Sequence, residues 1–257
     1  LGPGNLQTAI HQRNLAVVLD DLDRVDEAES AYRASQTVIE QLLGNDHPNT
    51  AASYLNLAVL LDMRRGKYEE AEELYRRALA IRRAKLGDNH AVTGQSLQLY
   101  ALFLLNRGRL EESERHYREA RALFAAINPR HFEVGKCDNG LALIAGRRGD
   151  HALAERLMGS VVGLFLEQLG ENHKFVWQVQ GNQAREIAAQ GRVAEAAELS
   201  RAVAARLEAI EGPESEAVGT ELERLAGYLA ALGRGDEAAP LAARAAAIAA
   251  KTAAGGT

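Results

Sequence analysis

Residues 66–79 read GKYEEAEELYRRAL, and the pattern in them occurs six times along the chain. In each copy a tight turn is followed by a helix opening with a small residue, usually with an aromatic residue four places on. The turns fall, at intervals of 43, 42, 41, 42 and 42 residues, at Asp23, Gly66, Gly108, Gly149, Gly191 and Gly233. A period this steady over most of 257 residues predicts an array of similar repeats rather than a globule with one core.

Each repeat is predicted to contain two helices. In the second repeat the run from Ala51 to Arg65 places Leu57, Leu60 and Leu61 at the spacing of one helical face, which predicts a first helix, helix A. Gly66 ends it, and acidic residues after the glycine favour the start of a second helix, helix B, which we expect to run to about Leu86.

Three positions on one side of helix B repeat with the same character. They read Ala71, Tyr75 and Ala78 in the second repeat, Ala28, Tyr32 and Ser35 in the first, and Ser113, Tyr117 and Ala120 in the third. The later repeats read Ala154, Met158 and Val161; Ala196, Ser200 and Val203; and Ala238, Ala242 and Ala245. The side chains at these positions become smaller toward the C-terminus. Because smaller side chains bury less apolar area, we expect the last two repeats to be the least stable.

With the stretch 43–51, LGNDHPNTA, these residues resemble the tetratricopeptide repeat, whose usual period is 34 residues, in the long form found in the kinesin light chain family and its bacterial relatives. HEAT-type repeats share the longer period, but a glycine turn followed by Ala, Tyr and Ala favours the tetratricopeptide repeat. The resemblance implies an all-α fold, a right-handed superhelical solenoid of six antiparallel helix pairs. We expect a single array with repeats at about 1–43, 44–86, 87–128, 129–169, 170–211 and 212–250, and a disordered tail at 251–257.

Composition narrows the class of partner and the compartment. The net charge of −5 argues against a protein that binds nucleic acid by neutralising phosphates. The longest apolar runs, such as 55–61, are far shorter than the ~20 residues of a spanning helix, so we expect no membrane insertion. The single cysteine, Cys137, fits a reducing compartment, and we expect a cytoplasmic protein. The opening Leu1-Gly2 lines up with Leu43-Gly44, as in a fragment cut at a repeat boundary.

Nothing in the sequence indicates catalysis or a cofactor. The phosphate-binding glycine loop, the His-Glu-x-x-His motif and the Cys-x-x-Cys motif are all missing from the sequence. Four histidines recur at the repeat spacing: His47, His90, His131 and His173. Successive repeats are separated by about 10 Å, so these side chains cannot share one metal ion, and we expect them to cap the helices that follow.

The resemblance implies that helix A lines the inner wall of the superhelix, where polar residues would contact a bound peptide. Asparagine occurs there at Asn14, Asn56 and Asn182, while Gln98 and Asn139 stand one place earlier in their repeats. An amide both donates and accepts, so a ladder of amides suits the backbone of an extended peptide. Neighbouring candidates are Arg13, Gln95, Lys136, Gln178 and Arg185, whose positive charges favour an acidic segment in the ligand. Alternatively, the asparagines only tie one repeat to the next.

Two further features bear on the groove. The two-carboxylate clamp of chaperone-binding relatives is missing, because Ile10, Gln95 and Leu99 stand where that clamp has lysine, lysine and arginine. In the fifth repeat Gln180, Gln183 and Glu186 occupy places that are mainly apolar in other repeats. They form either a satisfied buried network or a weak seam.

The leading hypothesis is a non-catalytic scaffold that binds a peptide or a segment of a partner protein. One alternative is a sensory or docking part of a larger signalling protein or enzyme. Another is self-assembly, in which exposed ends of the array stack to form a homo-oligomer.

Overall fold

The computed structural model describes residues 5–255, and every regular element within that range is helical. Residues 251–255 of the expected tail belong to the last helix, whereas residues 256–257 and the expected boundary at Leu1-Gly2 lie outside the described range. The chain divides into two compact units, the first ending at Asn128 and the second beginning at Pro129.

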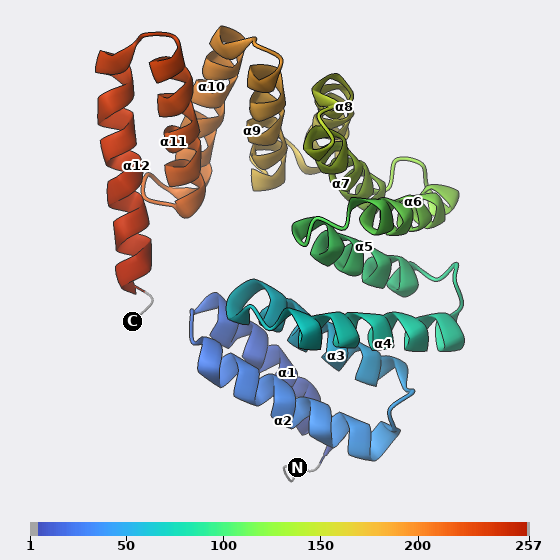
Figure 1. Ribbon diagram of the computed structural model, residues 1–257. Coiled ribbons are helices and arrows are strands. Elements are labelled where there is room, and N and C mark those ends of the chain that lie inside the picture. The colour runs from blue at the N-terminus through green and yellow to red at the C-terminus, as the bar shows by residue number, and fades with distance from the viewer. Residues whose placement is uncertain (1–4, 256–257) are drawn as a thin grey trace. The chain divides into compact units, whose positions relative to one another are not determined.

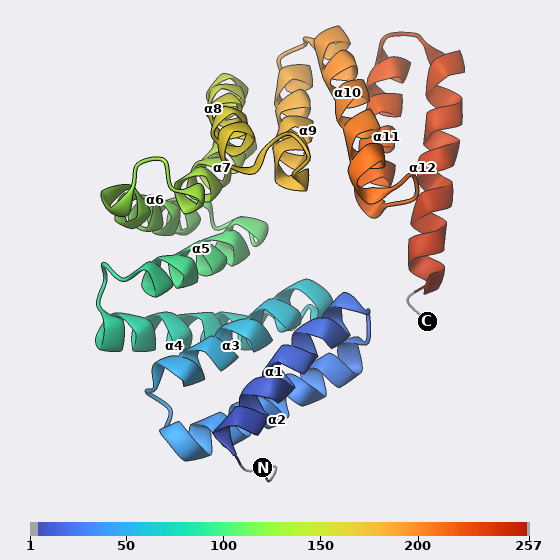
Figure 2. The same cartoon turned by 180° about the vertical axis from the view of Figure 1, so that it is seen from behind.

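Each unit contains three helix pairs (Figures 1 and 2). The first unit comprises α1 (Leu6–Asp21), α2 (Val25–Leu43), α3 (Pro48–Leu60), the π-helical turn η1 (Leu61–Arg65), α4 (Tyr68–Leu86), α5 (Ala91–Asn106) and α6 (Leu110–Ile127). The second unit comprises α7 (Phe132–Arg147), α8 (His151–Leu169), α9 (Lys174–Ala189), α10 (Val193–Glu211), α11 (Glu216–Ala231) and α12 (Gly235–Gly255). Odd-numbered helices are the A helices and even-numbered ones the B helices. The six predicted pairs are confirmed: each A helix packs on the B helix after it, and within a unit each B helix packs on the next A helix.

Histidine caps start four of the A helices. The Nδ1 atom of His47 accepts a hydrogen bond from the backbone N–H of Asn49 at 3.1 Å. The Nδ1 atoms of His90, His131 and His173 each accept from the N–H of the residue two places later, at 3.1–3.3 Å. Asn5 and Ser215 cap the other two A helices through side-chain oxygens. The predicted capping role of the four histidines is confirmed, and it satisfies an N–H group that the first helical turn leaves open.

A left-handed residue joins each A helix to its B helix. Its φ is +60° at Asp23 and lies between +63° and +84° at the five turn glycines. Glycine adopts this conformation without strain, and aspartate tolerates it better than most residues. The six turn positions found in the sequence are therefore confirmed.

The second A helix differs from its prediction at both ends. It begins at Pro48 rather than Ala51, because His47 is the cap and proline suits the first helical position. Its last turn is not α-helical: η1 is a π turn in which the N–H of Gly66 donates to the carbonyl of Leu61. Between the cap residue His47 and the left-handed Gly66 there is one residue more than in the other five repeats. The π turn accommodates this residue because it is wider than an α-helical turn.

The repeated helix-B positions are largely buried. Tyr32, Tyr75 and Tyr117 are at most 6 % exposed, and the ring centroid of Tyr75 lies 5.3 Å from that of Phe103. In the last repeat the corresponding residue, Ala242, is exposed. The side chains at these positions therefore become smaller toward the C-terminus, as predicted, and in the last repeat the position is no longer buried.

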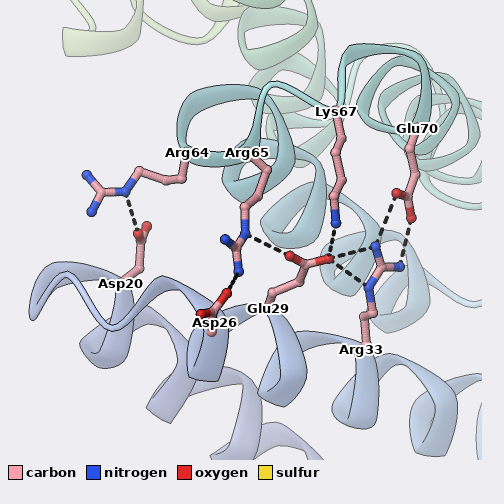
Figure 3. A network of polar contacts seen from close by, with 8 residues as sticks. All are labelled: Asp20, Asp26, Glu29, Arg33, Arg64, Arg65, Lys67 and Glu70. Atoms are coloured by element: carbon pink, nitrogen blue, oxygen red, sulfur yellow. Dashed lines mark hydrogen bonds and ion pairs between the residues drawn. The ribbon is translucent and has the colours of Figure 1, made fainter. Parts of the chain in front are cut away.

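Ion pairs join the first repeat to the second (Figure 3). Glu29 of α2 accepts from Lys67 at 2.7 Å, from Arg65 at 2.8 Å and from Arg33 at 2.9 Å. Arg33 also reaches Glu70 at 2.7 Å. Burial raises the pKa of Glu29, but the hydrogen bonds from Lys67 and Arg33 outweigh it and lower the pKa to about 2.

The same kind of contact recurs at other junctions between repeats. Lys67 follows a turn glycine, as do Arg109 and Arg192. Arg109 pairs with Glu72 at 2.6 Å and Arg192 with Glu155 at 2.8 Å, each a carboxylate on the preceding B helix. At these three junctions a cation after the turn therefore pairs with a carboxylate of the preceding B helix.

Candidate functional site

The ten predicted contact residues all lie on A helices. Half-buried among them are Arg13, Asn56, Asn139 and Asn182. The exposed ones are Asn14, Gln95, Lys136, Gln178 and Arg185. The remaining residue, Gln98, is only 6 % exposed, which leaves little of its amide for a ligand.

Counting from each cap residue gives the structural register of the asparagines. Asn14, Asn56 and Asn182 each stand nine residues after the cap. The equivalent residues in the third, fourth and sixth repeats are Leu99, Gly140 and Arg224. Gln98 and Asn139 are one residue out of this row, so the row is not a continuous ladder of amides.

In the second unit a pocket of about 490 Å³ lies beside α9 and α11. Lys174, Gln178 and Asn182 follow one another at four-residue spacing on α9 and line it together. Across from them are Thr220 and Arg224, which occupy the same register positions on α11 as Gln178 and Asn182. The two predicted residues Gln178 and Asn182 are thus brought together.

The pocket contains polar side chains that have no partner among the described residues. Among residues 5–255, the side chains of Lys174, Gln178 and Asn182 take part in no hydrogen bond or ion pair. Arg224, by contrast, donates to Glu221 at 3.1 Å. The α9 side of the pocket therefore offers one ammonium and two amides to a ligand, while Leu207 of α10 adds an apolar surface. Three carboxylates complete the polar lining: Glu211, Glu216 and Glu221.

Two missing side chains let consecutive A helices of this unit approach closely. A Cβ atom at Gly181 of α9 would lie 2.6 Å from Oε2 of Glu221 on α11. A Cβ atom at Gly146 of α7 would lie 2.6 Å from Oε2 of Glu186 on α9. Both carboxylates are 2 % exposed, so each occupies the space that a glycine leaves.

Two of the three polar residues of the fifth repeat, Gln183 and Glu186, make hydrogen bonds or ion pairs. Oε2 of Glu186 lies 2.7 Å from Nδ1 of His151, and Oε1 accepts from Arg185 at 2.9 Å. Gln183 donates to the carbonyl of Glu155 at 3.4 Å, while Oε1 of Gln180 has no partner among the described residues. The contacts therefore agree with a buried network at Gln183 and Glu186, whereas the unpaired oxygen of Gln180 does not fit a fully satisfied network.

The predicted cations differ in their availability. Lys136 pairs with Glu133 at 2.9 Å, and Arg185 is engaged by Glu186. Arg13 has neither a hydrogen bond nor an ion pair in the described part of the chain, and burial lowers its pKa. In the first unit Arg13 is thus the predicted cation that is open to a ligand.

Sequence reasoning missed Arg82. This residue of α4 is 7 % exposed, and its guanidinium donates to the carbonyl of Val92 at 3.0 Å and to Ser96 Oγ at 2.8 Å, both on α5. Burial and the nearby Arg13 lower its pKa to about 10. The equivalent residue of α10 is Leu207, which lines the pocket described above. A comparison of the repeats would have identified Arg82, because the equivalent position of the other B helices is apolar. The residues there are Ile39, Phe124, Phe165 and Leu207.

Two other kinds of site have no candidate in the described part of the chain. No group of three or more His, Cys, Asp or Glu side chains within 5–255 is arranged to hold a metal ion. Over the same range, none of the helices has the length and apolar character needed to cross a bilayer.

Two models described as tetratricopeptide repeat match the sequence. One matches residues 7–84 and 60–124, and the other matches residues 137–160. No curated protein sequence matches the chain.

Solved structures share the fold. The tetratricopeptide-like repeats of a putative kinesin light chain from Podosopora anserina are 26% identical, with a TM-score of 0.63 over 80% of this chain and 98% of that one. BtubC (BKLC) from P. vanneervenii is 20% identical, with a TM-score of 0.69 over 90% of this chain and 92% of that one. A Rap protein complexed with competence and sporulation factor is 12% identical, with a TM-score of 0.67 over 96% of this chain and 77% of that one.

Proposed function

Because this chain belongs to the tetratricopeptide repeat family, we propose that it is a non-catalytic scaffold whose A helices hold an extended segment of a partner protein. The observation that carries the proposal is the pocket beside α9 and α11, where Lys174, Gln178 and Asn182 have no partner within residues 5–255. Polar groups that the protein leaves unpaired at a concave surface are available to a ligand.

The chemistry of the pocket suits a peptide backbone. An extended peptide presents one N–H and one C=O per residue, and the amides of Gln178 and Asn182 can pair with both. Lys174 can pair with a carboxylate of the segment, and Leu207 can contact an apolar side chain. Backbone contacts give affinity with little dependence on sequence, while Lys174 and Leu207 give specificity.

A protein of the same fold supports this reading. The Rap protein was solved in complex with competence and sporulation factor, so this fold can hold a partner. The likeness to that protein is one of fold, so its partner does not indicate which partner the present chain binds.

The first unit favours acidic residues in a bound segment. Arg13 is open to a ligand, and the nearly buried Arg82 adds positive charge close to it without a carboxylate partner. We propose that Asp or Glu side chains contact this part of the protein.

Selection from a library of random peptides tests the proposal. Peptides selected on the parent protein would be measured for affinity against the double variant Gln178→Ala/Asn182→Ala. Loss of two amide contacts should weaken binding about tenfold or more, since each hydrogen bond contributes about 0.5–1.5 kcal/mol.

A matched control separates loss of contact from loss of fold. Gln41→Ala/Asn106→Ala removes the same two amide types from exposed positions outside the pocket, and it should bind like the parent. Circular dichroism should show unchanged helicity in both variants. Equal binding by the two double variants, or failure to select any peptide, would refute the proposal.

A further inference from the structure

A second cavity lies in the first unit and is separate from the residues of the proposed peptide groove. Its volume is about 440 Å³, and it is lined mainly by the B helices α4 and α6, with Tyr100 of α5. None of the ten predicted groove residues is part of it. Any ligand of this cavity would therefore be additional to a peptide bound along the A helices.

Positive charge predominates in this cavity. Four arginines line it, Arg76, Arg83, Arg109 and Arg115, together with His116. The two carboxylates in the lining, Glu72 and Glu112, are both occupied by Arg109, at 2.6 and 2.7 Å. Glu72 and Glu112 are therefore engaged by the same arginine, and neither of them pairs with Arg76, Arg83 or Arg115.

Two of the arginines have no ion-pair or hydrogen-bond partner in the part of the chain that the structure describes. Arg83 pairs with Asp88 at 3.1 Å and also with Glu119. Arg76 and Arg115 are exposed, and neither makes a hydrogen bond or ion pair to any other residue in 5–255. Arg76 comes from α4 and Arg115 from α6, so two different helices each contribute one unpaired guanidinium group to the cavity.

His116 adds a buried polar group without a hydrogen bond. It is 8 % exposed, its ring centroid lies 5.2 Å from that of Tyr100, and its Nδ1 is 3.9 Å from a carboxylate oxygen of Glu119. No hydrogen-bond partner for Nδ1 exists among the described residues. Burial and the neighbouring Arg115 lower its pKa, so the ring is neutral at pH 7 and has one N–H to donate.

We propose that this cavity binds a phosphate monoester dianion between Arg76, Arg115 and His116. A doubly charged group matches the two unpaired guanidinium groups of Arg76 and Arg115, and its oxygens accept hydrogen bonds from the forked N–H groups that arginine presents. A cavity of this size holds a phosphorylated side chain or a small phosphate ester.

Calorimetric titration of the full chain tests this site with two probes. One is a blocked pentapeptide with phosphoserine between alanines, and the other is inorganic phosphate; the peptide with plain serine is the blank. In Arg76→Gln/Arg115→Gln the affinity for the bound probe should fall about tenfold or more. Arg118→Gln/Arg156→Gln removes the same charge from exposed residues outside the cavity and should bind like the parent.

The ring resonance of His116 gives a second readout. A bound dianion favours the imidazolium, so saturating phosphate should raise the pKa of His116 in the parent and not in Arg76→Gln/Arg115→Gln. Tighter binding of the phosphopeptide than of inorganic phosphate identifies a partner protein as the source, and the reverse identifies a small phosphate ester. Equal affinity of the two double variants, or a His116 resonance that phosphate does not move, overturns the proposal.

Discussion

The carboxylate of Glu29 accepts hydrogen bonds from Lys67, Arg65 and Arg33 at the junction of the first two repeats. Its side chain is 12% exposed, so solvent screens these pairs less than it would on an open surface. Because the pKa in the folded state is about 2, below the 4.5 of the free side chain, the ionised form is favoured by folding. This contribution to stability is present above pH 4.5 and is lost as the pH falls toward 2.

We therefore expect Glu29→Gln to destabilise the protein by about 1–2 kcal/mol at pH 7, a value reduced from the full pKa shift because the cations are partly exposed. The difference from the parent should shrink as the pH is lowered from 5 to 3, as the parent loses the same interaction. Urea unfolding at several pH values measures this.

The control for this prediction is Glu73→Gln. Glu73 is an exposed residue of α4 that makes no hydrogen bond or ion pair within residues 5–255, so its substitution should leave the free energy of unfolding within about 0.5 kcal/mol of the parent. A destabilisation by Glu29→Gln that does not vary with pH would contradict the assignment.

Only part of the site could be predicted residue by residue. Asn182 was predicted because asparagine recurs on the A helices, and Gln178 was predicted as a neighbouring polar residue; the structure places both at one pocket. Arg224 was missed because the prediction followed amides, whereas the structural row continues with a cation. The pairing of Lys136 with Glu133 depends on side-chain rotamers, which a pattern of residue types does not contain.

The π turn η1 is the element that departs from the repeat. The other A helices reach their left-handed residue with one residue fewer, so the second repeat carries an insertion of one residue. Leu60 and Leu61 are both at most 1 % exposed, so the apolar face stays covered through the turn. The extra residue widens the helix locally instead of rotating the buried face out of register.

Deletion of Met63, which is 52% exposed within η1, should therefore be tolerated. We expect the turn to become α-helical and the free energy of unfolding to stay within about 1 kcal/mol of the parent, since no buried side chain is lost.

Deletion of Asn106 is the matched control for this prediction. Asn106 is exposed near the turn of the third repeat, where no extra residue exists, so its loss should shift the register and destabilise the protein by more than about 3 kcal/mol. Chemical unfolding compares the two deletions, and similar losses from both would argue against the insertion.

Helix pairs and turns were predictable because the sequence shows a period of about 42 residues, with a glycine at five of the six turns. The structure gives each of these turn glycines a positive φ. The start of α3 was placed three residues late, since Pro48 was not recognised as the first helical residue. The turn interval of 43 residues between Asp23 and Gly66 did contain the insertion. An interval alone does not say whether a loop or a helix absorbs the additional residue.

Over the whole chain, stability is expected to decline in the last two repeats. Ser200 and Ala242 stand where the first three repeats have buried tyrosines, and Ala242 is exposed. Less apolar area is buried at these positions, at roughly 25 cal/mol per Å². We expect amide hydrogens of α10, α11 and α12 to exchange faster than those of α3 and α4.

Hydrogen exchange followed by mass spectrometry of peptic fragments measures this difference. Substitution of Tyr75 by alanine should remove part of the advantage of α3 and α4, because it leaves a cavity beside Phe103. Slower exchange in the last two repeats than in α3 and α4 of the parent protein would disprove the expected order.

The two glycines under Glu186 and Glu221 have a consequence for how this chain and its relatives diverge. Alanine at position 146 or 181 would collide with a buried carboxylate, whereas loss of the carboxylate alone would leave an unfilled space beside the glycine. Each of the two substitutions, alanine for the glycine or a smaller residue for the glutamate, should destabilise the protein alone, and the second should relieve the effect of the first. Positions 146 and 186, and positions 181 and 221, should therefore be inherited as pairs among homologues.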